Sequence, residues 1–412
     1  MKKFFGNNAV VGQSGGPTAA INATLSGVIA AELEKMAVSG GTLYGMKHGI
    51  DGMLKEELWE LNGIFADPAD IELLKMTPGA ALGSCRTKLP NPEDDAAFYE
   101  KLFGIFEKYG IGRFYYIGGN DSMDTANKVS KYADMAGYEF SAIGVPKTID
   151  NDLCGTDHTP GFGSAAKFIA TTIAELRSDT AVYAQKAVTV VEIMGRDAGW
   201  LTAAAALADT KNGVGADLIY LPELPFSFEN CCEDIKKCWE NHSDLIIAIS
   251  EGVKYENGEY LGADGSRKDK FGHVSLSGTA KVLSERIKAE LGCKVRAIEL
   301  NTPQRCALHI ASKTDIDESA GVGRAAVEAA YNGASGVMAA YIRTSNAPYT
   351  VKYEMLKVSE IANQVKAVPR SYINEAGNNI TAEGREYLLP LIVGEVAPIY
   401  ENGIPKHFVM PR

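Results

Sequence analysis

The feature that most constrains the fold is a strand, a glycine turn and a helix that recur in this order along the chain. The first unit has an apolar run at 9–11, then glycines, then a helix expected at about 18–34. A second unit places a strand at 114–117 and a helix at 122–135 on either side of two glycines. Strands that alternate with helices are typical of parallel sheets. We therefore predict an α/β fold with two lobes of mostly parallel sheets flanked by helices.

The chain is long enough for more than one such lobe. With 412 residues, of which 46% are hydrophobic, it exceeds the size at which one hydrophobic core stops growing. We expect a first lobe from 1–150 with part of the C-terminal tail, a second from 151–345 with a polar insertion near 255–273, and an extension at 346–412 that packs on the lobes. Further strands are expected at 141–145, 188–193, 245–250 and 295–300, and further helices at 165–176, 201–208, 279–291 and 355–365.

Charge and cysteine content exclude several classes of protein. The net charge is −11 and no segment forms a basic stripe, which argues against a nucleic-acid partner. No apolar run reaches the roughly 20 residues that span a bilayer, and the N-terminus turns polar too early for a signal peptide. We therefore expect a cytoplasmic protein with no membrane partner. Seven cysteines without paired spacing indicate reduced thiols rather than metal ligands.

One loop combines the groups that phosphoryl transfer needs. Lys147 lies three residues before Asp150, and Asp152 follows two residues later. Side chains two apart point the same way in an extended segment, so the two carboxylates would share a face beside a positive charge. One carboxylate would accept a proton from an attacking hydroxyl while the other holds a metal ion. The alternative is a turn rich in Asp and Asn, which form turns for local reasons.

Two glycine turns precede expected helices. Gly15 and Gly16 follow the first strand, where backbone N–H groups and the helix dipole favour a phosphate. The turn at 119–122 repeats this arrangement with polar side chains at the start of a helix. As alternatives, the glycines only tighten turns and the polar residues only cap the helix. Because parallel strands end at one edge of a sheet, we expect both turns to converge with the Lys147 loop.

Basic residues lie beside small residues or strand ends in several places. Arg86 follows a small-residue segment, Arg196 and Glu251 each follow a strand, and Arg296 and Arg305 lie on either side of the end of the last strand. Guanidinium groups bind phosphate through two hydrogen bonds, and a carboxylate accepts hydrogen bonds from sugar hydroxyls. The alternative is that each arginine is merely solvated. Together these residues suit a sugar phosphate.

The ordered set of motifs resembles the phosphofructokinase family over roughly residues 8–345. The motifs that carry the resemblance are Gly15-Gly16, Gly83-Ser84-Cys85-Arg86, Gly118-Gly119-Asn120-Asp121-Ser122, Thr148-Ile149-Asp150-Asn151-Asp152, Met194-Gly195-Arg196, Glu251-Gly252, Arg296 and Gln304-Arg305. The resemblance implies a two-lobed α/β fold in which fructose 6-phosphate receives a phosphoryl group on its 1-hydroxyl, a step of glycolysis and gluconeogenesis.

The resemblance also implies roles for individual residues. Asp150 matches the catalytic base, with Lys147 and Arg196 beside the reaction centre. Asp152 matches the carboxylate near Mg²⁺, and Asn120 stands where most of the family has a second aspartate. The sugar phosphate would be held by Thr148, Asp150, Met194, Gly195, Arg196, Glu251, Arg296 and Arg305. The phosphoryl donor would be held by Gly15, Gly16, Arg86, Gly119, Asp121, Ser122 and Lys147.

Two positions separate the donor classes of this family. Members that use ATP generally have glycine where this chain has Asp121 and Lys147, whereas members that use pyrophosphate resemble this chain. An aspartate where a nucleotide phosphate should pass repels it by about 4 kcal/mol per pair of unit charges 4 Å apart at moderate effective dielectric. We therefore predict a Mg²⁺-dependent pyrophosphate:fructose-6-phosphate phosphotransferase whose reaction runs readily both ways. A structural ion pair between Lys147 and Asp121 is the alternative explanation of both residues.

The function, the residue that a neighbouring subunit contributes and the oligomeric state stay open at this point. An ATP-dependent phosphofructokinase is the second candidate, and a noncatalytic sugar-phosphate-binding regulatory subunit, favoured only by Asn120, is the third. The arginine that bacterial ATP enzymes lend across a subunit interface aligns with Ala187, and Lys186 beside it is a weaker substitute. The resemblance implies a homodimer or a homotetramer.

Overall fold

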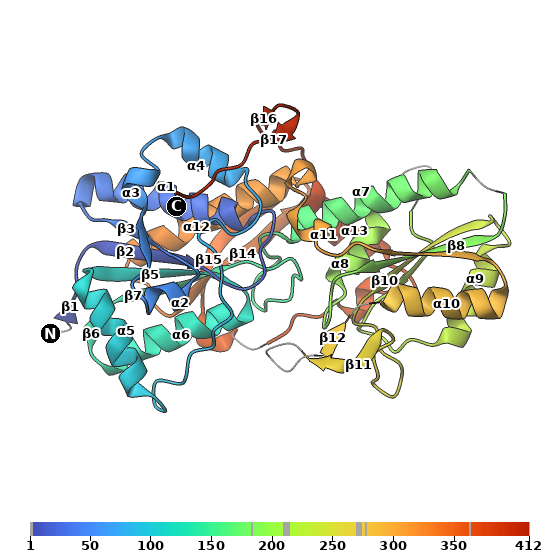
Figure 1. The fold of residues 1–412 in the computed structure, drawn as a ribbon, viewed down its shortest axis with the longest axis horizontal. Helices are drawn as coiled ribbons and strands as arrows, with labels where there is room; N and C mark the ends of the chain where they lie inside the picture. Colours follow the sequence, from blue (N-terminus) through green and yellow to red (C-terminus); the bar gives the residue numbers. More distant parts are fainter. Residues whose placement is uncertain are drawn as a thin grey trace.

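The computed structural model describes residues 3–182, 184–208, 215–268, 274–276, 278–361 and 364–411. Two lobes lie side by side, and each is a sheet covered by helices (Figure 1). The α/β class expected from the alternating pattern is confirmed. Among the described residues, no helix combines the length and apolarity that crossing a bilayer requires.

The first lobe contains a seven-stranded sheet within the described residues, in the order β15-β14-β7-β5-β2-β3-β4. Its strands are β2 (Asn8–Gln13), β3 (Leu43–Met46), β4 (Leu58–Glu60), β5 (Ile111–Gly118), β7 (Ser141–Pro146), β14 (Val337–Asn346) and β15 (Tyr349–Lys357). The β2, β3, β5, β7 and β14 strands are parallel to their neighbours, while β4 and β15 add antiparallel edges. The central strands are buried on both faces, which explains their nearly continuous apolar sequences.

Alternating side chains of the central strands divide between two helical layers. Tyr115 and Ile117 pack with α1 (Ile21–Ser39) and α12 (Lys313–Tyr331), whereas Phe114 and Tyr116 pack with α5 (Ala96–Lys108) and α6 (Asn120–Met135). The helices α1 and α12 approach closely because Gly27 faces the backbone of α12. A Cβ atom at Gly27 would lie 2.0 Å from the carbonyl oxygen of Ala320.

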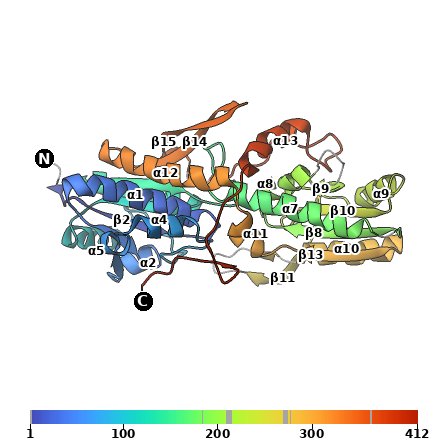
Figure 2. The same cartoon turned by 90° about the horizontal axis from the view of Figure 1, so that it is seen from above.

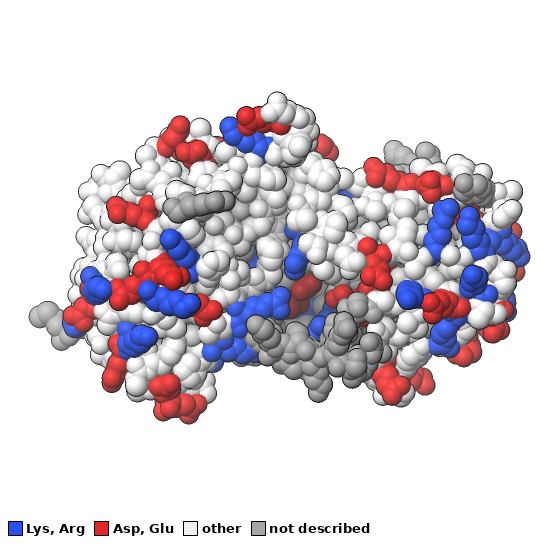
Figure 3. Space-filling view, viewed as in Figure 1, with Lys and Arg blue, Asp and Glu red and all other residues white. Residues whose placement is uncertain are grey.

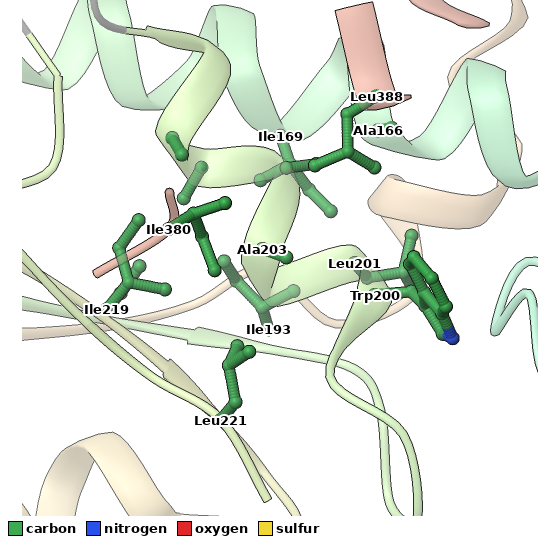
Figure 4. Close-up of a cluster of buried hydrophobic side chains, with 14 of the residues drawn as sticks. Ala166, Ile169, Ile193, Trp200, Leu201, Ala203, Ile219, Leu221, Ile380 and Leu388 are labelled. Carbon is green, nitrogen blue, oxygen red and sulfur yellow. The ribbon is translucent and has the colours of Figure 1, made fainter. Parts of the chain in front are cut away.

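The second lobe is built on a parallel sheet in the order β13-β8-β10-β9. Its strands are β8 (Ala187–Ile193), β9 (Leu218–Tyr220), β10 (Asp244–Ser250) and β13 (Lys294–Glu299). One face packs against α7 (Phe162–Thr180) and α8 (Trp200–Ala203), and the other against α9 (Phe228–Cys238) and α10 (Thr279–Leu291). Figure 4 shows that Ile380 and Leu388 of the C-terminal segment enter the first of these cores beside Ile169.

The remaining elements are short. They are β1 (Lys3–Phe4), α2 (Ile50–Met53), α3 (Leu61–Ile64), α4 (Pro68–Lys75), β6 (Tyr138–Glu139), β11 (Ala263–Lys268), β12 (Val274–Leu276), α11 (Pro303–Cys306), α13 (Ala382–Leu388), β16 (Tyr400–Glu401) and β17 (Ile404–Pro405). The helix α13 lies beside α7 and α8 of the second lobe (Figure 2).

Two of the expected helices differ in the structure. The helix expected at 355–365 is wrong over 355–360, because β15 continues to Lys357 and a 3-10 turn, Val358–Glu360, follows; residues 362 and 363 of that range lie outside the described residues. Long-range pairing with β14 fixes this segment as a strand. The helix expected at 201–208 is α8 followed by a 3-10 turn, Ala204–Ala208.

The course of the chain between the lobes bears on their boundaries. Although α12 and β14 fall within the range 151–345, α12 packs on α1 and β14 pairs with β7. We therefore propose that the first lobe consists of 1–146 and 313–357 and that the second is inserted between them. Within the insertion expected near 255–273, β11 pairs antiparallel with β12, and residues 269–273 lie outside the described residues.

Candidate functional site

Three turns at the carboxyl ends of β2, β5 and β7 line one cavity of about 320 Å³. The residues that line it are Ser14, Gly15, Gly16, Cys85, Arg86, Thr87, Tyr116, Gly119, Asn120, Asp121, Ser122, Thr125, Lys147, Thr148, Asp150 and Asp152. The expected convergence of the glycine turns with the Lys147 loop is therefore confirmed. Direct contacts support it, because the hydroxyls of Ser14 and Ser122 are hydrogen-bonded and Lys147 Nζ donates to the carbonyl of Gly16 at 2.8 Å.

A second cavity of about 340 Å³ adjoins the first and includes residues of the second lobe. It is lined by Gly16, Pro17, Thr18, Arg86, Lys147, Thr148, Ile149, Asp150, Met194, Arg196, Asp197, Glu251 and Arg305. Arg86, Lys147 and Asp150 line both cavities, so a carboxylate and two cations lie where the two spaces meet. Figure 3 shows basic and acidic side chains gathered at the hollow between the lobes.

The environment of Asp150 suits a proton acceptor. Burial, and then repulsion from Asp152, raises the pKa of Asp150 to about 6, although the Lys147 charge opposes this shift. Burial likewise lowers the pKa of Lys147 to about 8 against the opposing effect of Asp150 and Asp152. A carboxyl with a pKa near the working pH is ionised and still basic enough to take a proton. The loop is thus more than a turn formed by local hydrogen bonds.

Asp121 and Lys147 do not pair with each other. Asp121 Oδ1 lies 3.0 Å from Lys88 Nζ, and both side chains are more than half exposed. Lys147, in contrast, is buried against Gly16. The structural ion pair considered for Lys147 and Asp121 is therefore wrong. Asp121 instead places negative charge beside the first cavity.

The donor set around Asp152 fits one magnesium ion shared with a substrate. Asn120 Oδ1 is buried and has no hydrogen-bond partner among the described residues, and it lines the same cavity as Asp152. Within those residues, no cluster of three or more Asp, Glu, His or Cys forms a metal cage. Mg²⁺ typically takes one or two protein oxygens together with water and substrate phosphate oxygens. One carboxylate and one free amide oxygen match that preference.

The second cavity has the groups expected for a sugar phosphate. Glu251 accepts a hydrogen bond from the backbone N–H of Gly195 at 3.4 Å, and burial raises the pKa of Glu251 to about 7. Gly195 has a φ of 137°, a conformation that favours glycine. Arg305 Nε is buried without a partner among the described residues. These groups leave hydrogen-bonding capacity for a ligand in this cavity.

The structure does not bring Arg296 or Lys186 to this site. Lys186 precedes β8, and Arg296 pairs in register with Thr189 in the first half of that strand, whereas the cavity begins beyond its last residue. Arg296 instead pairs with Asp179 at 3.4 Å, and Lys186 Nζ lies 5.0 Å from the centre of the Trp239 ring. Both residues therefore lie outside the cavity within one chain, and the sugar-phosphate role expected for them stays a prediction.

Two functional candidates escaped the sequence analysis. Asp197 lines the second cavity, and its charge adds to the effect of burial in raising the pKa of both Asp150 and Asp152. Its position directly after Arg196 was the available signal. Lys366 contacts the segment 151–157 from the C-terminal tail, and nothing in the local sequence indicates that contact.

Comparisons with known proteins agree with this geometry. The family model described as Phosphofructokinase matches residues 8–330. The chain is 43% identical to the pyrophosphate–fructose 6-phosphate 1-phosphotransferase of Halomonas elongata, covering 97% of this chain and 95% of that protein. It is 40% identical to the protein of the same name from Methylococcus capsulatus, covering 98% and 96%. The crystal structure of the pyrophosphate-dependent phosphofructokinase from Nitrosospira multiformis superimposes with a TM-score of 0.88 at 40% identity, covering 98% of this chain and 96% of that one.

Proposed function

The chain belongs to the phosphofructokinase family, and we propose that it transfers a phosphoryl group from pyrophosphate to the 1-hydroxyl of fructose 6-phosphate. The observation that carries this proposal is the pair of adjoining cavities that share Asp150 and Lys147. One cavity combines glycine turns suited to phosphate with Asp152 and Asn120, whose oxygens suit magnesium. The other combines a carboxylate with arginines, as a phosphorylated sugar requires.

The arrangement supports an in-line displacement. Asp150 accepts the proton of the sugar 1-hydroxyl while that oxygen forms a bond to the nearer phosphorus of pyrophosphate. The bridging P–O bond breaks, and inorganic phosphate leaves. Lys147 and Arg86 line both cavities and stabilise the negative charge that develops on the transferred group.

The other residues bind and orient the two substrates. Arg196, Arg305 and Glu251 hold the sugar phosphate, and the backbone of Gly15 and Gly16 approaches the pyrophosphate. Asp152 and Asn120 would hold Mg²⁺, which neutralises charge on the donor oxygens when bound.

The donor preference follows from the acidic side chain beside the first cavity. Asp121 lines this cavity, and its side chain is 62% exposed. The additional phosphates of a nucleotide donor would therefore pass a solvated negative charge. Pyrophosphate ends before that point, and Lys147 supplies a compensating positive charge inside the cavity. Repulsion of this kind rejects the larger donor more strongly than it weakens the smaller one.

The assembly is proposed as a homodimer or a homotetramer in the cytoplasm. Arg296 and Lys186 lie at the end of the second sheet opposite the cavity. That position supports a role at the sugar-phosphate site of a neighbouring copy. Light scattering on the purified protein measures the assembly state.

A donor assay tests the proposed function. Enzyme freed of contaminating pyrophosphate is supplied with fructose 6-phosphate, Mg²⁺ and either pyrophosphate or ATP, and fructose 1,6-bisphosphate is measured. We expect turnover with pyrophosphate and at most trace turnover with ATP. Turnover with ATP alone would overturn the donor assignment, and sugar binding without turnover on either donor would indicate a regulatory subunit.

A further inference from the structure

A short segment of the C-terminal tail passes against the loop that carries the catalytic carboxylates. We call residues 364–368 the tail strap. Val365 forms a β-bridge with Leu153, and the backbone N–H of Lys366 donates to the carbonyl of Asp152 at 2.9 Å. The strap also contacts α8, because Trp200 Nε1 donates to the carbonyl of Lys366 at 2.8 Å. The strap thus connects the carboxylate loop to the start of α8.

The hydrogen bonds that the Lys366 ammonium group donates all go to this loop. Its Nζ donates to Asn151 Oδ1 at 3.2 Å and to the carbonyls of Thr156 and Asp157 at 3.2 and 2.7 Å. It also lies 5.2 Å from the centre of the Trp200 ring. Three donors with three acceptors leave this ammonium group no capacity to bind a substrate.

Asn151, which accepts a hydrogen bond from Lys366, has an unusual backbone conformation. Asn151 stands between Asp150 and Asp152, is completely buried and has a φ of 53°. A residue with a Cβ atom is strained in this left-handed region, less so for Asn than for most, and contacts from its surroundings help to hold it there. Besides Lys366, the hydroxyl of Tyr387 holds it, accepting from Asn151 Nδ2 at 3.2 Å and donating to the carbonyl of Asp157 at 2.5 Å.

We propose that Lys366 and Tyr387 are positioning residues that hold Asn151 left-handed and thereby set the directions of the flanking carboxylates, Asp150 and Asp152. Relaxation of residue 151 to an ordinary conformation would turn both carboxylates out of their present directions. This inference rests on the proposed phosphotransferase activity. Both residues lie beyond residues 8–330, the part matched by the family model.

The test compares Lys366→Met and Tyr387→Phe with the wild-type protein. We expect Lys366→Met to lower kcat by about 10- to 100-fold while KM for fructose 6-phosphate changes by less than about threefold. Tyr387→Phe removes only a hydroxyl, so it keeps the packing and should lower kcat by about three- to tenfold. Lys167→Met is the matched control, because Lys167 Nζ also binds the tail, through the carbonyl of Gly394 at 2.6 Å, but away from the loop. The control should keep wild-type kcat.

A double-mutant cycle separates positioning from general support of the fold. Glycine adopts a positive φ without strain, so Lys366→Met should cost less kcat in an Asn151→Gly background than in the wild type. Equal losses in both backgrounds would overturn the inference, and so would a kcat within twofold of wild type for both Lys366→Met and Tyr387→Phe. A wild-type protein without phosphotransferase turnover would instead refute the proposed function itself.

Discussion

Replacing Glu251 with Gln should stabilise the protein at alkaline pH while weakening its binding of sugar. The Glu251 carboxyl has a pKa of about 7 instead of 4.5, because burial disfavours the charged form. Between those pH values the folded protein binds more protons than the unfolded chain, so the stability that this group contributes is complete below pH 4.5 and is lost as pH rises through 7. Each pKa unit corresponds to about 1.4 kcal/mol, so ionised Glu251 costs roughly 3 kcal/mol at pH 8.

Glutamine avoids this cost because it carries no charge and still accepts the hydrogen bond from the Gly195 N–H. The variant should therefore exceed the wild type in free energy of unfolding by up to about 3 kcal/mol at pH 8, with a difference close to zero at pH 4.5. Urea denaturation of both proteins at the two pH values measures this difference. Equal or lower stability of Glu251→Gln at pH 8 would refute the reasoning, and an unchanged KM for fructose 6-phosphate would refute the sugar-binding role.

The remaining predictions concern catalysis, metal and packing. Asp150→Ser should lower kcat by about 10²- to 10⁴-fold with little change in fructose 6-phosphate affinity, and steady-state kinetics that return wild-type turnover would contradict its role as base. Because the pKa of Asp150 is raised to about 6, protonation should remove the base as pH falls through 6, and a pH profile of kcat/KM that stays flat from 7.5 to 5 would exclude this. Chelation of Mg²⁺ by EDTA should abolish turnover and added Mg²⁺ should restore it, whereas full activity in EDTA would remove the metal from the proposal. Gly27→Ala should destabilise the α1–α12 contact by about 1–3 kcal/mol, because its Cβ would lie 2.0 Å from the Ala320 carbonyl oxygen, and an unchanged thermal midpoint would contradict the close approach.

The central strands and the phosphate-binding turns follow from local sequence because each is encoded by contiguous residues. An apolar run such as 9–11 needs burial on both faces, and the glycines after it permit a tight turn. The C-terminal end of β15 shows the limit of reasoning from local sequence. The segment 355–365 has helical patterning, yet its first residues, 355–357, belong to β15 because they pair with β14. Pairing between strands overrides a weak local preference.

The candidate site could be predicted where its residues follow strands, and could not where distant segments meet. Asp150, Arg196 and Glu251 each come within four residues of the end of a parallel strand, so their convergence follows from topology. Arg296 could not be placed from the sequence, because resemblance assigns a role without saying which copy of a chain performs it. Lys366 was missed because a single lysine in a polar tail carries no periodicity, spacing or composition that marks its distant contacts.

Because α12 and β14 return to the first lobe after the second lobe has been encoded, they constrain the order in which the two sheets can form during synthesis. Residues 1–146 leave β7 as an open edge and α1 without its companion helix until α12 and β14 have emerged from the ribosome. The strands β8, β9, β10 and β13 of the second sheet all lie between 147 and 312, but Ile380 and Leu388 of the C-terminal segment complete the core of that lobe. The second sheet can therefore pair its strands before the first sheet is complete, whereas a fragment truncated before 313 carries an unfinished first sheet with an aggregation-prone border and lacks part of the second core.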